Sequence, residues 1–123
     1  MDTFEILSQL CSAAGVSGAE GSAAETAAKL LEEYGEVTLD NALGSVICKV
    51  GSWEDGKPVM LLDAHIDEIG MIVTYITDDG FLKISGCGGL DTRLLLAQQV
   101  TVYGKEKLTG IVTSTPPLLE KDS

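Results

Sequence analysis

The only histidine of the chain, His65, lies in a short segment that also carries carboxylates at Asp63, Asp67 and Glu68. An imidazole nitrogen binds zinc and similar divalent metals. A carboxylate two residues further on can accept a hydrogen bond from the other ring nitrogen and so orient the ring. This spacing makes His65 a candidate metal ligand and Asp67 a candidate for the group that positions it.

The same residues also fit a purely structural role. A single histidine near the end of a strand is commonly hydrogen-bonded to its neighbours without any ligand, and short motifs match many unrelated sequences. A catalytic zinc ion usually takes three protein ligands, whereas this segment supplies one imidazole. The residues alone therefore leave both roles open for His65.

The segment before His65 determines where its side chain would lie. The run Val59–Leu62 follows Gly56 and Pro58, and a short, continuous apolar run of this kind predicts a buried strand. In open α/β sheets, ligands bind at the carboxyl ends of the strands. The sequence thus predicts that His65 lies at the ligand-binding edge of a sheet.

Two helices and a hairpin are expected ahead of this strand. Apolar residues at helical spacing predict a first helix over Thr3–Ala14, and a second helix follows the break at Gly15–Gly18. The segments Glu36–Asp40 and Ser45–Val50 flank a turn and predict an antiparallel pair of strands.

The second half of the chain is rich in strand signals. Gly70–Thr77 and Phe81–Ile84 flank a tight-turn sequence, and Gln99–Tyr103 and Lys107–Thr113 flank another. A short turn is expected within Asp91–Ala97. This pattern is typical of a small antiparallel barrel or sandwich.

The two halves do not make one complete fold. A strand that is apolar on both faces needs helices on both faces of its sheet, and the sequence predicts few helices. The β-rich half ends in a polar tail after Pro116 and Pro117, without a closing element. We therefore expect part of a larger protein, or a chain whose apolar faces are covered by partners.

The composition restricts the classes of partner. The net charge of −11 gives no electrostatic footprint for nucleic acid and opposes binding to anionic membranes. The three cysteines are odd in number and far apart, which argues against a disulfide framework and favours the cytoplasm. We expect no secretory signal and no membrane span, because the N-terminus lacks a basic region and apolar stretches are short.

Four segments, in order along the chain, resemble the co-catalytic metallo-aminopeptidases of the glutamyl-aminopeptidase and tetrahedral-aminopeptidase type. The first is Gly15–Gly18, and the second, Ala64–Gly70, looks like the first metal-ligand motif of that family. Gly88–Arg93 resembles a signature of the family's inserted β-domain. Gly110–Val112 with the two later prolines resembles another part of the insert. Ordered matches over nearly the whole chain are far more specific than any one of them.

The resemblance implies an α/β fold in two parts. Residues 1–69 would form the N-terminal piece of a metallopeptidase α/β catalytic domain, and residues 70–123 would form part of a β-rich, barrel-like dimerisation domain. Both parts are expected to be incomplete in this chain. The family assembles through the β-rich domain into large, often dodecameric, homo-oligomers, so the resemblance also implies a homo-oligomer.

The resemblance further implies peptide hydrolysis at a site with two divalent metal ions, zinc or cobalt. N-terminal residues, with glutamate or aspartate as a candidate preference, would be released from peptides. His65 would be a metal ligand, and Asp67 would fix its tautomer by a hydrogen bond. No catalytic role is assigned to Glu68. Asp91 and Arg93 are expected to pair with each other or with a neighbouring subunit.

The sequence also departs from the family pattern. The bridging carboxylate, the second histidine and the general base of the family lie downstream of the β insert, beyond Ser123. Leu118 stands where the family suggests a histidine. We therefore expect this chain alone to bind no metal stably and to be inactive. The alternatives are a non-catalytic, self-assembling interaction module derived from the family, and an unrelated β-rich binding protein.

Overall fold

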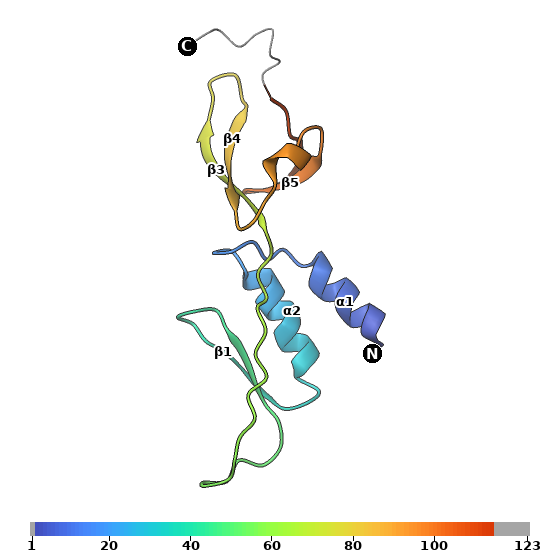
Figure 1. The fold of residues 1–123 in the computed structure, drawn as a ribbon, viewed down its shortest axis with the longest axis vertical. Coiled ribbons are helices and arrows are strands. Elements are labelled where there is room, and N and C mark those ends of the chain that lie inside the picture. The colour runs from blue at the N-terminus through green and yellow to red at the C-terminus, as the bar shows by residue number, and fades with distance from the viewer. Residues whose placement is uncertain (1, 115–123) are drawn as a thin grey trace. The chain divides into compact units, whose positions relative to one another are not determined.

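The computed structural model describes residues 2–114 (Figure 1). The chain divides into two compact units, Met1–Gly88 and Gly89–Ser123. The two prolines, Leu118 and the polar tail singled out in the sequence lie outside the described residues. The expected boundary between residues 69 and 70 concerns the domains of a complete enzyme, and it stays a prediction.

The first helix, α1, spans Thr3–Ser12 and confirms the expected N-terminal helix. Its start is fixed by a capping box, in which the Asp2 carboxylate accepts a hydrogen bond from the Glu5 amide at 2.8 Å. The Glu5 carboxylate in turn accepts a hydrogen bond from the Asp2 amide at 3.1 Å. These two bonds satisfy amides that have no partner within the helix.

The second helix, α2, spans Gly21–Leu31 and carries the core of the first unit. Among the described residues, the buried apolar side chains are those of Ala23, Ala24 and Ala28 on this helix. α2 packs against α1 and against both strands of the hairpin formed by β1 (Glu36–Leu39) and β2 (Val46–Lys49). The small alanine side chains allow the close approach of these neighbours.

The three strand pairs expected from the sequence are all present and antiparallel. β1 pairs with β2, placing Glu36 opposite Lys49. β3 (Gly70–Ile76) pairs with β4 (Leu82–Cys87), and the register shifts between Val73 and Tyr75.

The second unit contains the remaining strand pair, β5 (Gln99–Tyr103) and β6 (Lys107–Ile111), together with a short 3₁₀ helix at Thr92–Leu94. That helix lies within the segment where a turn was expected. In the described part of the chain, each hairpin remains a separate two-stranded sheet. The barrel-like closure of the β-rich half therefore stays an expectation for a complete protein.

The expectation of a buried strand at Val59–Leu62 is wrong for this structure. The segment forms no strand, and its side chains are exposed to 63% at Val59, 84% at Met60, 83% at Leu61 and 87% at Leu62. A strand that is apolar on both faces needs neighbours along its edges and cover over its faces. The described residues supply neither, so the run lies open to solvent.

Within residues 2–114, no helix has both the length and the apolar character needed to cross a membrane. The three cysteines are free thiols, with Cys11 exposed and Cys48 and Cys87 partly buried.

Candidate functional site

The structure brings His65 and Asp67 into direct contact. The Nδ1 atom of His65 lies 3.0 Å from the Oδ1 atom of Asp67 and 3.0 Å from the backbone oxygen of the same residue. Both neighbours of Nδ1 are oxygen acceptors, so this nitrogen carries the ring proton when the imidazole is neutral. Nε2 is then the nitrogen with a lone pair for a metal ion. The side chain of His65 is 86% exposed, which leaves the ring accessible.

A second contact holds the carboxylate of Asp67. The hydroxyl of Ser17 donates a hydrogen bond to Oδ2 of Asp67. The hydrogen bond from Ser17, followed by that from His65, lowers the pKa of Asp67 below its ordinary value. The carboxylate is thus kept in the ionised form, which accepts hydrogen bonds from the ring N–H and from the Ser17 hydroxyl at the same time.

The loop that carries Ser17 is attached to the segment that carries Asp67. The amide of Glu68 donates to the backbone oxygen of Gly15 at 2.8 Å. The amide of Gly15 donates to Oε1 of Glu68 at 3.2 Å. Val16 and Glu68 form an isolated parallel bridge at the same place. Main-chain and side-chain bonds together fix the loop beside Asp67.

Two glycines allow this close approach. A Cβ atom added at Gly15, which is buried, would lie 2.9 Å from the Cβ atom of Ala23 on α2. A Cβ atom added at Gly70 would collide with both methyl groups of Val16. Glycine is therefore required at both positions because the neighbouring chain passes too near for a side chain.

Of the residues singled out in the sequence, the structure brings His65, Asp67 and Glu68 together with the loop after α1. Asp63 is exposed, and the contacts of the His65 ring involve Asp67 alone. Sequence reasoning missed the part played by Ser17 and gave Glu68 no role. A signal was present for both, since Ser17 and Glu68 belong to the first two segments that carry the family resemblance.

Asp91 and Arg93 pair with each other, which confirms the first of the two arrangements expected from the sequence. The guanidinium of Arg93 donates to the two carboxylate oxygens of Asp91 at 2.9 and 2.7 Å, and the Arg93 amide adds a third bond at 3.1 Å. These bonds lower the pKa of Asp91. The pair caps the 3₁₀ helix of the second unit.

The site offers only part of a metal centre. Over residues 2–114, no group of three or more His, Cys, Asp or Glu side chains converges so that it could hold a metal ion. His65 and Asp67 are suited to act as one metal ligand and the carboxylate that orients it. The described residues supply no further part of a two-metal site.

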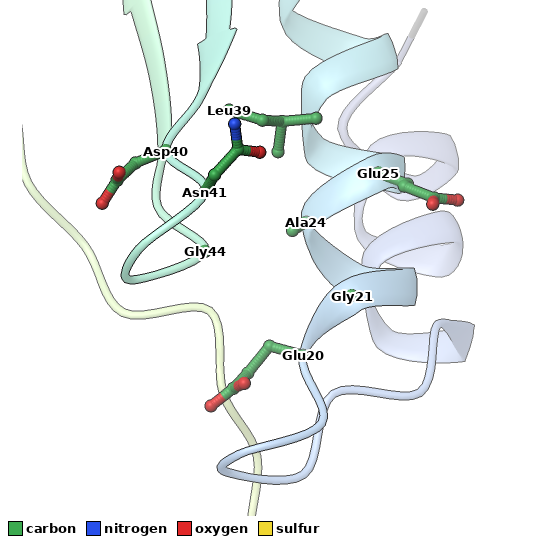
Figure 2. A pocket seen from close by; sticks show the side chains of 8 residues that line it. All are labelled: Glu20, Gly21, Ala24, Glu25, Leu39, Asp40, Asn41 and Gly44. Atoms are coloured by element: carbon green, nitrogen blue, oxygen red, sulfur yellow. The ribbon is translucent and has the colours of Figure 1, made fainter.

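A shallow pocket lies elsewhere in the first unit, between the start of α2 and the turn after β1 (Figure 2). Its lining includes the carboxylates of Glu20, Glu25 and Asp40. Glu20 accepts a hydrogen bond from the Gly18 amide at 2.6 Å. Asp40 accepts two from the turn amides at 3.1 and 3.0 Å. Figure 2 shows Glu25 pointing away from the turn. The carboxylates thus cap backbone or point outward, and we do not take this pocket as the functional site.

Comparison with known proteins identifies a family and several relatives. Residues 44–123 match the family described as M42 glutamyl aminopeptidase. The chain is 34% identical over 117 residues to the putative aminopeptidase FrvX of Escherichia coli K12, covering 93% of this chain and 32% of that protein. The chain thus spans about a third of the length of the curated relatives that it matches.

Solved structures give the same picture. A TET aminopeptidase from a marine sediment archaeon of the Thaumarchaeota superposes with a TM-score of 0.83 at 33% identity, covering 96% of this chain and 33% of that one. The TET1 peptidase of Pyrococcus horikoshii, which can assemble into a tetrahedron or a large octahedral shell, superposes with a TM-score of 0.79. Its identity to this chain is 35%, and the match covers 98% of this chain and 36% of that peptidase.

Proposed function

Because this chain belongs to the M42 glutamyl aminopeptidase family, we propose that it is the N-terminal portion of a metal-dependent aminopeptidase that releases N-terminal residues from peptides. The chain would contribute the first metal ligand, His65, and the residue that orients it, Asp67. The observation that carries the proposal is the contact of 3.0 Å between Nδ1 of His65 and Oδ1 of Asp67, which leaves Nε2 for a metal ion.

The proposed active centre would hold two divalent metal ions, zinc or cobalt. When bound, such a pair activates a water molecule and polarises the scissile carbonyl group. His65 would bind one ion through Nε2, and Asp67 would keep the ring proton on Nδ1. The further ligands and the general base would come from the part of a complete family member that this chain does not span.

The remaining features of the proposal concern substrate, assembly and location. A preference for N-terminal glutamate or aspartate rests on the family description alone. Homo-oligomerisation through a β-rich domain, residues 70–123, is supported by the assembly of the related TET1 peptidase. A cytoplasmic location is supported by the separated, free cysteines.

The direct test compares the complete protein with its His65→Ala variant. Metal content would be measured after dialysis, and activity would be measured on glutamyl, aspartyl, leucyl and alanyl chromogenic amides with added zinc or cobalt. We expect the variant to lose one metal ion and nearly all activity. Normal metal content and activity in the variant would overturn the assignment of His65.

The present chain should be assayed in the same way. We expect little or no hydrolysis with either metal, because one imidazole does not build a two-metal site. Hydrolysis that disappears in the His65→Ala variant would show that the chain, alone or as an oligomer, builds a working site, and would contradict the proposed division of ligands.

A non-catalytic, self-assembling module is the second candidate function. It is favoured by the many large apolar side chains that are exposed on the hairpins, such as Ile72, Tyr103 and Ile111. The mass of the chain in solution distinguishes the two. A discrete oligomer without activity would favour a module, whereas polydisperse association would favour part of an enzyme that lacks its remaining structure.

A further inference from the structure

We propose that the loop after α1 positions the metal ligand, with Ser17 as a positioning residue that acts on His65 through Asp67. The metal part of this inference rests on the function proposed above. The positioning itself is a property of the described residues, and it can be measured without metal.

The two carboxylate oxygens of Asp67 have different partners. Oδ2 accepts the hydrogen bond from the Ser17 hydroxyl, and Oδ1 faces Nδ1 of His65 at 3.0 Å. A carboxylate held at one oxygen alone can rotate about its terminal torsion, which has a broad energy profile. The Ser17 bond restrains that rotation and keeps Oδ1 directed at the ring.

Ser17 is itself held in place by the attachment of its loop. Its loop is joined to the Asp67 segment by the two hydrogen bonds between Gly15 and Glu68. On its other side, Gly15 lies so near α2 that an added Cβ atom would be 2.9 Å from the Cβ atom of Ala23. The hydroxyl is therefore held between a helix and the ligand segment. Glu68, which has no evident part in the chemistry, acquires a role as the side chain that holds the loop.

The direction of the Asp67 carboxylate determines which ring nitrogen of His65 carries the proton. The nitrogen that carries the proton in a neutral histidine is set by the hydrogen bonds that the ring makes. With Nδ1 facing the Asp67 carboxylate, the proton is on Nδ1 and Nε2 has its lone pair free. Loss of the Ser17 bond would release the carboxylate and raise the share of the Nε2–H form, in which Nε2 has no lone pair for a metal ion.

The tautomer can be measured directly because His65 is the only histidine in the chain. The full 123-residue chain would be labelled with ¹⁵N-histidine and studied by long-range ¹H–¹⁵N correlation at about pH 8, where an ordinary imidazole is neutral. We expect mostly the Nδ1–H form in the wild type. In the Ser17→Ala variant, the ratio of Nδ1–H to Nε2–H should fall about fivefold, as for the loss of one hydrogen bond.

Three further variants separate positioning from folding. Ser17→Thr retains the hydroxyl and should keep the wild-type tautomer ratio. Ser17→Val has the shape of threonine without the hydroxyl and should behave like Ser17→Ala. Ser22→Ala, an exposed serine on α2, is the matched control and should leave the ratio unchanged. If Ser17→Ala disrupts the amide spectrum, the comparison of Ser17→Thr with Ser17→Val decides.

An unchanged tautomer ratio in both Ser17→Ala and Ser17→Val would overturn the inference, because the backbone oxygen of Asp67, also 3.0 Å from Nδ1, would then fix the proton by itself. The ligand role of His65 and the positioning role of Ser17 can each be rejected without rejecting the other. A Ser17 effect together with normal metal content in the complete His65→Ala protein would reject the ligand role and retain the positioning role. No Ser17 effect together with loss of metal in the complete His65→Ala protein would reject the positioning role and retain the ligand role.

Discussion

Gly15 and Glu68 are 53 residues apart in sequence, and each donates its amide hydrogen to an oxygen of the other, over 2.8 and 3.2 Å. This exchange attaches the loop after α1 to the segment that presents His65. It explains why two of the segments that resemble the aminopeptidase family, distant in sequence, form one site. We therefore expect residues without direct contact to His65 to influence its geometry.

Replacing Asp67 should weaken metal binding without removing a ligand. Asp67→Asn keeps an oxygen acceptor but removes the negative charge that holds the ring proton on Nδ1. Loss of an orienting partner of this kind typically lowers metal affinity about 10- to 100-fold. We expect that loss for cobalt or zinc in the complete protein, measured by competition with a chelator.

The matched control for this change is Asp63→Asn, an exposed carboxylate in the same segment. It should leave the dissociation constant unchanged. Equal losses in the two variants would show that overall negative charge, rather than the contact with Nδ1, governs the affinity.

The close approach of Gly70 and Val16 predicts a specific stability defect. Gly70→Ala places a methyl group against both methyls of Val16. Overpacking of this kind costs about 1–3 kcal/mol in the free energy of unfolding. Urea unfolding would measure the loss. Val16→Ala should relieve the collision, so the double variant should recover much of the stability.

Gly89→Ala is the control, since a Cβ atom there meets no atom within 4 Å. Its effect should stay within about 0.5 kcal/mol. If the two alanine variants were equally destabilised, the cost would reflect alanine in place of glycine in general and not the contact with Val16.

The Asp91–Arg93 pair predicts a pH-dependent turn. Arg93 lowers the pKa of Asp91 in the folded state, so the stabilisation is present above the pKa of the unfolded chain. It is lost as the pH falls through the lower, folded-state pKa. In Arg93→Gln the pKa should rise toward its ordinary value of 3.8, as followed by carboxyl ¹³C shifts. Lys105→Gln, in the turn between β5 and β6, removes the same charge and should leave the titration of Asp91 unchanged.

The exposed run Val59–Leu62 predicts self-association of the chain when it is studied alone. Neighbouring apolar side chains that are each more than half exposed form a continuous patch that water disfavours. Leu62→Lys should lower the weight-average mass in sedimentation experiments and reduce the binding of an apolar dye. Leu43→Lys alters an equally exposed leucine outside this run and should have a smaller effect. A mass that responds equally to both variants would contradict a patch centred on this run.

Sequence reasoning succeeded where structure is local. The helical spacing of apolar residues predicts α1, and alternation with turn residues predicts the three hairpins, because these signals act over a few residues. It failed at Val59–Leu62, where burial depends on neighbouring strands that the described residues do not provide. The contact between His65 and Asp67 followed from their spacing.

The contact of Ser17 with Asp67 did not follow from any pattern, since it joins residues 50 positions apart. The family resemblance pointed to both segments but gave no reason for them to meet. That reason lies in α2 and in Gly15 and Gly70, which let the chain pass closely enough for the hydroxyl to reach the carboxylate.

The long span between Ser17 and Asp67 also has a kinetic consequence. Joining two points of an unfolded chain this far apart costs about 3–4 kcal/mol of entropy in a simple loop model. The helix α2 and the β1–β2 hairpin lie within the span and shorten it as they form. The geometry of the ring is therefore expected to be established after these local elements have formed, because they reduce the entropy lost on joining the two points.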